Sequence, residues 1–292
     1  MLRSLWFEGR DAVARPPLDR EIEVDVVVAG AGIVGLTTAF LLEREGMDVA
    51  VLEMRRVAAG ATGYNTAKLS SLHGLTYTQL DSSLGRDNAR LYGEANEAGV
   101  ARVFELAGEL GIECDLARKP NYTYSEDAAD VDDLREEARL AAELGLPASY
   151  VEELDLPFGV AGAVRFEDQA EFHPVKYVDG LAAALRGPVH EGTRVTGLGS
   201  GGVNTAAGHA VRASHVVVAT HLSFLDRGLY FARCHPERSY VVAGRAAGAK
   251  PAGMYLSTES PAHSIRAHGD WLLVGGESHK TCLLYTSDAA DE

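Results

Sequence analysis

The hydrophobic pattern near the start of the chain predicts a strand, a helix and a second strand in close succession. Residues 24–29 form a β-branched run that is typical of a strand buried in a parallel sheet. Apolar side chains then recur at helical spacing over residues 33–45, and Gly46 can cap the end of that helix. Residues 48–53 form another apolar run that ends on an acid, Glu53. This is the pattern of a βαβ unit, which takes about 30 residues.

The rest of the chain alternates between extended and helical patterns after a polar loop at residues 58–73. We expect helices at residues 80–110, 130–144 and 174–186, and the first of these can divide into two. Runs typical of strands lie at residues 122–124, 160–166, 193–198, 215–220, 239–242, 254–257 and 271–274. The mixture of strands and helices predicts an α/β fold.

Two sheets are expected to interleave along the sequence. Residues 20–75 and 190–225 contain the most apolar strand patterns, and we expect them to form a Rossmann-like, nucleotide-binding layer. Residues 76–189 and 226–281 are expected to form an interleaved substrate domain, or cap, on a mixed β-sheet. The sequence shows neither an internal repeat nor a low-complexity linker between these parts.

Composition and charge narrow the classes of function. The 292 residues include 27 Lys and Arg against 42 Asp and Glu, a formal net charge of −15. Such an acidic chain is poorly suited to neutralise nucleic-acid phosphates or to form a polybasic membrane anchor. The uncharged run at residues 26–42 contains three glycines and fits a strand, a turn and a helix better than a membrane span. We therefore expect no nucleic-acid partner and no membrane partner.

Cysteine use and the N-terminal sequence indicate the cytoplasm. Cys114, Cys234 and Cys282 lie far apart, a spacing that forms neither a disulfide framework nor a zinc motif. Residues 1–23 read as a polar arm and lack the apolar core of a secretory signal. The expectation is a cytoplasmic protein that binds no metal in this chain.

A glycine-rich motif joins the first strand to the first helix. It reads Gly30, Ala31, Gly32, Ile33, Val34 and Gly35, which fits G-x-G-x-x-G in its strand–turn–helix context. The first glycine permits the tight turn, the second lets the backbone approach a pyrophosphate, and the third lets helix and strand pack closely. The helix N-terminus offers N–H groups and a partial positive charge to phosphates. Glu53, at the end of the second strand, is placed to accept hydrogen bonds from the adenosine ribose.

The residues around Glu53 bear on which dinucleotide is bound. Arg55 and Arg56 suggest a 2′-phosphate, but the carboxylate of Glu53 would repel one, which disfavours NADP. A nicotinamide-binding fold would usually continue with a third strand soon after Glu53. A long polar loop at residues 59–68 follows instead, which can run beneath a flavin. An NAD-dependent dehydrogenase stays open as an alternative, as does a non-catalytic flavin-binding module for electron transfer.

At this point the chain resembles the FAD-dependent oxidoreductases of the D-amino-acid oxidase family, which includes glycine, sarcosine and γ-glutamylputrescine oxidases. It is most similar to a bacterial branch in which many members carry a C-terminal Rieske iron–sulfur domain. The resemblance covers residues 20–281, and the stretches that carry it are 26–53, 58–74, 192–198, 215–220, 238–242 and 271–276. It implies that the Rossmann-like layer at residues 20–75 and 190–225 is an FAD-binding layer, and that the substrate is a small amine or amino acid.

The resemblance also implies roles for matching positions. Residues 30–35 would bind the pyrophosphate and Glu53 the ribose, while Val195 would meet the adenine through its backbone. The remaining positions implied to approach the cofactor are Thr62, Asn65, Thr66, Lys68, Ala219 and Thr220. For Lys68, a contact with flavin or a role in activating oxygen stays open beside an ordinary surface lysine. His221 stands where the family has a glycine after Ala-Thr.

The reaction that the resemblance implies is oxidation of a C–N bond by hydride transfer to the flavin. Such a transfer needs chiefly positioning and a neutral amine, so the sequence assigns no catalytic residue. The electron acceptor can be oxygen, a quinone or a Rieske centre in a further C-terminal part. The substrate itself, the acceptor and the oligomeric state are not specified by the sequence.

Two other groups of polar residues are expected to have ordinary structural roles. Asp168, Glu171 and His173 are close in sequence, but no further ligands are spaced to complete a metal site, so we expect a solvated loop. Tyr255 and Arg266 lie on or beside predicted strands of the second sheet, as do Arg238 and Tyr240. An Arg–Tyr pair there can clamp a carboxylate, although ordinary strand residues are the favoured interpretation.

The end of the chain is expected to be foreign to the protein. Residues 282–292 correspond residue by residue to one reading frame of a transposon-type sequencing adapter. We exclude them from arguments about the fold, as for a cloning scar. We expect the natural protein to continue past residue 281, and the chain as given to bind FAD weakly and to turn over no substrate.

Overall fold

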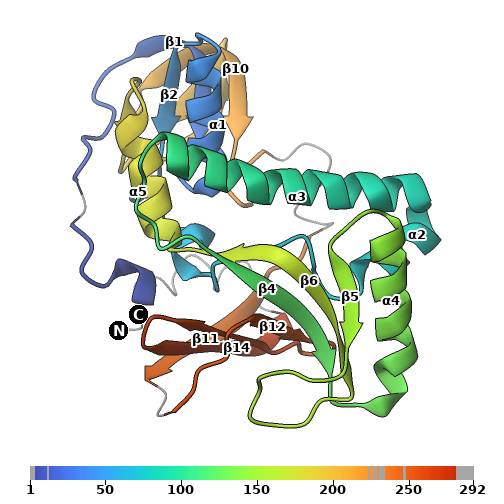
Figure 1. The fold of residues 1–292 in the computed structure, drawn as a ribbon. Coiled ribbons are helices and arrows are strands. Elements are labelled where there is room, and N and C mark those ends of the chain that lie inside the picture. The colour runs from blue at the N-terminus through green and yellow to red at the C-terminus, as the bar shows by residue number, and fades with distance from the viewer. Residues whose placement is uncertain are drawn as a thin grey trace.

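Two β-sheets form the framework of the protein, and helices lie between and beside them (Figure 1). The computed structural model describes residues 4–11, 13–222, 224–225, 229, 234–245 and 248–280. Residues 282–292, for which a foreign origin is expected, lie outside this described part. The two-sheet arrangement confirms the predicted α/β class with mixed sheets.

The first sheet has six strands in the order β7-β2-β1-β10-β9-β8. Four of them run parallel: β7 (Val189–His190), β2 (Val49–Leu52), β1 (Ile22–Ala29) and β10 (Ala210–Val218). β9 (Gly202–Thr205) and β8 (Val195–Gly199) complete the sheet as an antiparallel extension. Val26 to Val28 of β1 are buried, as a strand covered on both faces requires.

Helices pack on this sheet through one continuous apolar core. α1 (Ile33–Arg44) follows β1 and packs beside α5 (Pro174–Ala184), which precedes β7. The last turns of α3 (Arg86–Glu109) contribute Leu106 and Ala107 to the same core. In Figure 1, α3 runs across the molecule between the upper sheet and the lower one. This core therefore fixes the relative position of the two sheets.

The second sheet has eight strands, seven of them in the order β11-β14-β13-β12-β4-β6-β3, with β5 paired to β6. The strands are β3 (Lys68–Leu69), β4 (Ala117–Ser125), β5 (Ala148–Val151), β6 (Gly162–Glu171), β11 (Glu237–Arg245), β12 (Met254–Ser257), β13 (Ser264–His268) and β14 (Trp271–Lys280). β12 pairs with β4 in parallel and the other pairings are antiparallel, so the sheet is mixed. β3 brings Lys68 from the first third of the chain into this sheet.

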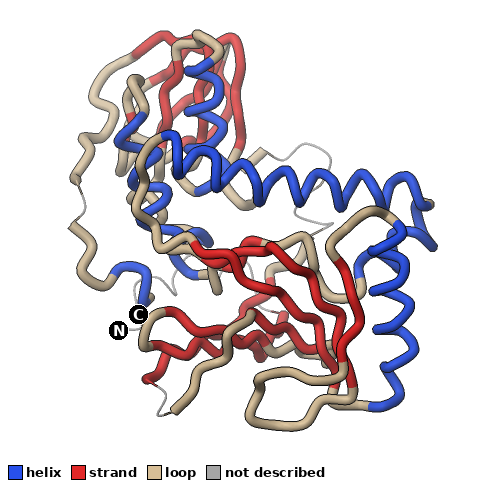
Figure 2. Tube along the Cα trace, in the orientation of Figure 1, coloured by secondary structure: helices blue, strands red, loops and turns tan. Residues whose placement is uncertain are grey.

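Two helices pack beside one end of the second sheet, as Figure 2 shows. α4 (Val131–Glu143) covers β5 and β6, and its side chains form a second core with α2 (Thr76–Leu84). The predicted helix at residues 80–110 begins earlier, at Thr76, and divides at Gly85, whose φ of +87° a helix cannot contain. The described residues also form three short 3-10 helices, η1 (Leu5–Phe7), η2 (Ala61–Tyr64) and η3 (Ala128–Asp130). No helix within it is long and apolar enough to cross a bilayer.

Candidate functional site

The glycine motif forms a tight turn at the carboxyl end of β1, between β2 and β10. Gly30 has a φ of +108°, and a Cβ there would overlap the carbonyl oxygen of Ala219 at the end of β10. A Cβ on Gly35 would overlap the carbonyl oxygen of Gly30. The turn thus needs glycine at both positions for backbone packing alone. It lies at the edge of the parallel strands where sheets of this kind bind ligands.

The first turn of α1 is arranged to accept an anion. Gly32 is the N-cap residue and has no side chain with which to cap the helix. The N–H of Ile33 donates to Thr62 Oγ1 at 3.1 Å, so η2 lies directly against the helix start. A Cβ on Gly32 would lie 2.9 Å from Thr62 Oγ1. Gly32 thus presents backbone beside the Thr62 hydroxyl at the helix start, an arrangement that suits a pyrophosphate.

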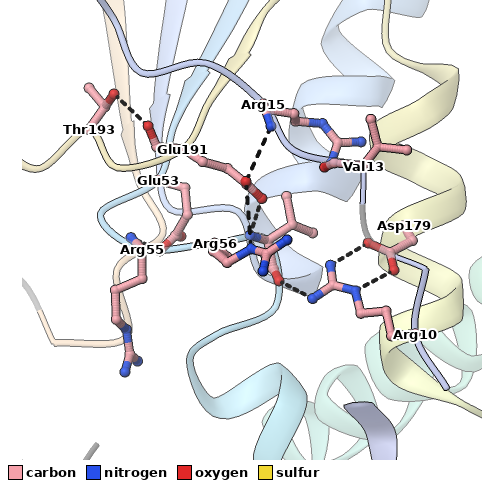
Figure 3. A network of polar contacts seen from close by, with 10 residues as sticks. Arg10, Val13, Arg15, Glu53, Arg55, Arg56, Asp179, Glu191 and Thr193 are labelled. Atoms are coloured by element: carbon pink, nitrogen blue, oxygen red, sulfur yellow. Dashed lines mark hydrogen bonds and ion pairs between the residues drawn. The ribbon is translucent and has the colours of Figure 1, made fainter. Parts of the chain in front are cut away.

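Glu53 follows β2 directly, and two backbone groups fix its carboxylate. Oε2 accepts from the N–H of Ala31 at 2.9 Å, and Oε1 accepts from the N–H of Arg55 at 2.8 Å. A carboxylate has about four lone-pair sites, so two remain for the hydroxyls of a ribose. The guanidinium of Arg55 donates to the carbonyl of Ala59 and points away from Glu53 (Figure 3).

Replacing Glu53 tests this placement. Glu53→Ala should weaken FAD binding by about 1–3 kcal/mol, because the ribose loses its acceptor and the N–H of Ala31 loses its partner. Glu53→Gln should also weaken binding, because its NH₂ group would face one of two backbone N–H donors. Titration of the folded apoprotein with FAD, followed by flavin fluorescence, measures both effects. An unchanged dissociation constant for FAD in Glu53→Ala would contradict the placement of this carboxylate in the cofactor site.

The loop after η2 connects the dinucleotide turn to the second sheet. The Asn65 side chain accepts from the N–H of Ala67 at 2.8 Å and donates to the carbonyls of Ala61 and Thr62, at 3.1 and 3.2 Å. The carbonyl of Thr66 accepts from Arg266 of β13 at 3.0 Å. Thr62, Asn65 and Thr66 thus come together, and their contact with a cofactor remains a prediction.

Lys68 lies half-buried where this loop enters the second sheet. Its Nζ donates to the carbonyl of Tyr255 in β12 at 2.6 Å. Burial, and secondarily the positive charge of Arg266, lowers the pKa of Lys68 to about 7. Lys68 is therefore tied to the second sheet, and its contact with flavin or role toward oxygen remains a prediction.

Arg266 is the most deeply buried charged group at this junction, although its sequence pattern favours an ordinary strand residue. Its side chain is fully buried and donates to the carbonyls of Thr66 and Ala67, at 3.0 and 2.6 Å. Its guanidinium lies 3.3 Å from the carboxylate of Glu171. Burial raises the pKa of Glu171, which the charge of Arg266 opposes. Arg266 therefore ties the loop to the sheet, a role different from clamping a substrate carboxylate.

Val195, Ala219 and Thr220 lie on or next to the six-stranded sheet. Val195 begins β8 and packs its side chain into the core with Val27 and Leu52. The N–H of Ala219 donates to the carbonyl of Ala29 at 2.8 Å, which extends the β1–β10 pairing. Val195 thus belongs to the same sheet as the glycine turn. Its proposed contact with adenine stays a prediction.

The residue after Thr220 keeps the backbone conformation of a glycine. His221 has a φ of +66°, in the left-handed region that favours glycine. The Thr220 hydroxyl donates to the carbonyl of Leu222 at 2.7 Å and so closes the turn around His221. The chain therefore forms the turn expected at this position although it carries a side chain there.

The residues at positions 168–173 differ from the solvated loop expected for them. Glu171 ends the long strand β6 and is ion-paired with Arg266. His173 is only 8% exposed, caps α5 by accepting from the N–H of Lys176, and has a pKa lowered to about 4, chiefly by burial. Within the described ranges, no group of three His, Cys, Asp or Glu side chains is placed to bind a metal ion.

Glu191 is a second acid near Glu53 that the sequence did not single out. Its carboxylate, 8% exposed, accepts from the N–H of Val57 at 2.8 Å and from that of Arg15 at 3.4 Å, and lies 3.9 Å from Arg56 (Figure 3). It thereby fixes the segment after Glu53 to the loop before β8. Nothing local marks this glutamate, because its partners are 134 and 176 residues away in the chain.

The donor set fits a dinucleotide with an adenosine ribose. Glycines let the turn pack closely at the start of α1, and Glu53 is held beside it with free acceptor capacity. A separate cavity of about 610 Å³ lies between the N-terminal arm, the end of α3 and α5, and its lining includes Arg10, Ile112 and Asp179. None of the predicted cofactor residues lines that cavity. The dinucleotide turn is therefore the functional site that the chemistry supports.

Comparison with known proteins defines the class. Residues 25–291 match the family described as FAD dependent oxidoreductase (DAO), so the chain belongs to this family. The family confirms FAD as the cofactor and an oxidoreductase as the class of protein. The fold agrees with solved flavoenzymes. Glycine oxidase from Geobacillus kaustophilus matches with a TM-score of 0.67 at 21% identity, over 90% of this chain and 73% of that one.

Another solved structure with this fold is L-proline dehydrogenase from P. horikoshii, with a TM-score of 0.69 at 18% identity over 89% of this chain and 71% of that one. Among curated proteins, YhfW of Bacillus subtilis (strain 168) is 31% identical over 95% of this chain and 57% of its own length. Its provisional name is that of a Rieske 2Fe-2S iron-sulfur protein. Gamma-glutamylputrescine oxidoreductase of Escherichia coli (strain K12) is 29% identical over 72% of this chain and 52% of its own length. The chain thus spans a little over half of these curated relatives.

Proposed function

We propose that the protein oxidises a C–N bond of a small amine or amino acid. The observation that carries the proposal is the segment at residues 66–68. It leads from the dinucleotide turn onto the second sheet, where it contacts Arg266 and Tyr255. A substrate held against that sheet would lie next to the segment that the family places at its flavin. The names of gamma-glutamylputrescine oxidoreductase, glycine oxidase and L-proline dehydrogenase support an amine or amino acid as the substrate class.

In this proposal the residues of this chain position the cofactor and hold the loop against the second sheet. The glycine turn and the start of α1 would bind the pyrophosphate, and Glu53 the ribose. Bound FAD supplies the acceptor for the hydride that leaves the carbon bearing nitrogen. Arg266, itself out of water, holds the carbonyls of Thr66 and Ala67 and closes the junction between loop and sheet. Fixed geometry is the main requirement of such a transfer.

Anaerobic titration of the full-length protein tests the proposed reaction. A panel of diamines, N-alkylated amines and amino acids is added, and the flavin absorbance is followed. We expect at least one of them to bleach the flavin and to yield the corresponding carbonyl product after the imine hydrolyses. Bleaching by NADH or NADPH, with no response to any amine, would favour nicotinamide-linked chemistry. A flavin reduced solely by a protein partner would favour an electron-transfer module.

We further propose that the electrons leave through a Rieske 2Fe-2S centre in the full-length protein. The name of YhfW supports this acceptor. Substrate reduction followed by electron paramagnetic resonance should then give the signal of a reduced Rieske cluster in the full-length protein. Rapid reoxidation of the flavin by oxygen, with no cluster signal, would support an oxidase instead.

A further inference from the structure

The N-terminal arm carries one deeply buried side chain, that of Trp6. The arm, described at residues 4–11 and 13–20, is largely exposed, and Val13 in it is 71% exposed. Trp6 is only 2% exposed. A tryptophan buries a large apolar area, so its insertion is the main attachment of this end of the arm.

Trp6 contacts the loop that follows η2 through a directional bond. Its Nε1–H donates to the carbonyl of Asn65 at 2.7 Å. The next residue, Phe7, packs its ring against Gly63, where a Cβ would overlap that ring. Two successive arm residues therefore fix the loop, one by a hydrogen bond and the other by shape.

A series of hydrogen bonds connects Trp6 to the dinucleotide turn. The Asn65 side chain donates to the carbonyl of Thr62 at 3.2 Å, and Thr62 Oγ1 accepts from the N–H of Ile33 at 3.1 Å. Ile33 is the first residue of α1. Trp6 is thus linked by three hydrogen bonds to the start of the helix that faces the pyrophosphate position.

The other edges of the Trp6 ring meet the second sheet and α5. The ring packs edge-on against His268 of β13 and His173 before α5, with centroids 4.9 and 5.1 Å apart. The guanidinium of Arg266 lies 5.7 Å from the ring centroid and donates to the carbonyls of Thr66 and Ala67. Trp6 therefore occupies the point where the loop, the second sheet and α5 converge.

Further contacts anchor the arm along its length. Arg10 forms a bidentate ion pair with Asp179 of α5, at 2.6 and 2.8 Å, and donates to the carbonyl of Val57 at 3.2 Å (Figure 3). The N–H of Leu18 donates to Thr193 Oγ1 at 3.0 Å, and the Leu18 side chain is buried. The arm is held at both ends, so the position of Trp6 is set by more than its own packing.

We propose that Trp6 is a positioning residue for residues 61–67, the loop that is expected to lie beside the flavin. In this proposal the N-terminal arm acts as a strap that holds the loop between the dinucleotide turn and the second sheet. This inference rests on the FAD site of the proposed function but is independent of the substrate. One ring makes both the hydrogen bond to Asn65 and the edge contacts with His173 and His268. Losing the N–H alone should loosen the loop while leaving the contacts with the two histidines in place.

The test compares Trp6→Phe with Trp6→Ala and with Val13→Ala, a control on the exposed part of the arm. Amide hydrogen exchange in the apoprotein is expected to increase at residues 61–67 in Trp6→Phe. FAD binding should weaken about fivefold, as for one lost hydrogen bond. Trp6→Ala should weaken it more or prevent folding, and Val13→Ala should match wild type. Because Trp6→Phe keeps an aromatic ring against His173 and His268, this variant carries the test even if Trp6→Ala does not fold.

Two readouts separate a positioning role from general stabilisation. A purely structural role would lower the melting temperature of Trp6→Phe without selective exchange at residues 61–67, which would overturn the proposal. Wild-type exchange and wild-type FAD affinity in Trp6→Phe would overturn it as well. Both measurements omit the amine, so a protein that fails to oxidise amines still gives a result for Trp6.

Discussion

Gly35→Ala is expected to weaken FAD binding severely and to destabilise the protein. A Cβ at this position would overlap the carbonyl oxygen of Gly30 and approach the Val28 side chain. The oxygen belongs to the backbone of the dinucleotide turn, so it cannot rotate aside as a side chain can. Either α1 moves away from β1 or the turn opens, and both changes disturb the pyrophosphate position. We expect a loss of more than about 3 kcal/mol in the free energy of unfolding.

FAD titration and denaturant unfolding of the same preparation measure both parts of this effect. Affinity should fall by at least roughly a hundredfold, which corresponds to about 3 kcal/mol. Gly99→Ala is a matched control, because Gly99 lies in α3 and a Cβ there would have nothing within 4 Å. That variant should be neutral or stabilised by up to about 1 kcal/mol. Wild-type FAD affinity in Gly35→Ala would contradict the glycine turn as the cofactor site.

The part of the fold that the sequence predicted well depends on local signals. The strand, turn, helix and second strand at residues 24–53 appear as β1, α1 and β2, within two residues of the expected bounds. Each has its own pattern, and the glycine spacing states where the turn lies. Buried parallel strands carry continuous apolar runs, which distinguishes them from half-exposed strands. The position of the dinucleotide turn is therefore readable before any tertiary contact is known.

Elements with weak local patterns were missed. β13 carries Arg266 and His268 on one face, which reads as polar, although Arg266 is fully buried. Its burial depends on hydrogen bonds to the carbonyls of Thr66 and Ala67, which lie 200 and 199 residues earlier in the chain. β3 has only two residues and gains its identity by pairing with β6. Such features follow from tertiary contacts that a single sequence does not show.

The same reason explains why the surroundings of the candidate site were harder to predict than its centre. Gly35 and Glu53 act through backbone contacts within one βαβ unit, with Gly30 and with Ala31. Trp6 reaches Asn65 across 59 residues, and Lys68 reaches Tyr255 across 187. A lone tryptophan in a polar arm is the one sequence signal for the first contact. The sequence identified Lys68 as a candidate, but it did not predict the burial that lowers the pKa of this lysine.

The burial of Lys68 predicts a stability that rises with pH. In the folded protein the pKa of Lys68 is lowered from 10.5 to about 7, first by burial and then by the charge of Arg266. Between these two pH values the unfolded chain binds a proton that the folded protein has released, so raising the pH favours folding. The gain is absent below about pH 7 and complete near the unfolded pKa. Each pH unit inside this window contributes at most about 1.4 kcal/mol.

Lys68→Met isolates this contribution, because methionine is of similar length and does not titrate. Between about pH 7 and about pH 9, wild type should gain roughly 2 kcal/mol more in its free energy of unfolding than Lys68→Met does. Lys176→Met is the matched control, since it removes the same charge from a half-exposed side chain paired with Asp115. It should keep the wild-type slope, because Lys68 remains in place. Urea unfolding of the apoproteins at several pH values gives the slopes directly, and equal slopes in wild type and Lys68→Met would show that Lys68 stays charged in the folded protein.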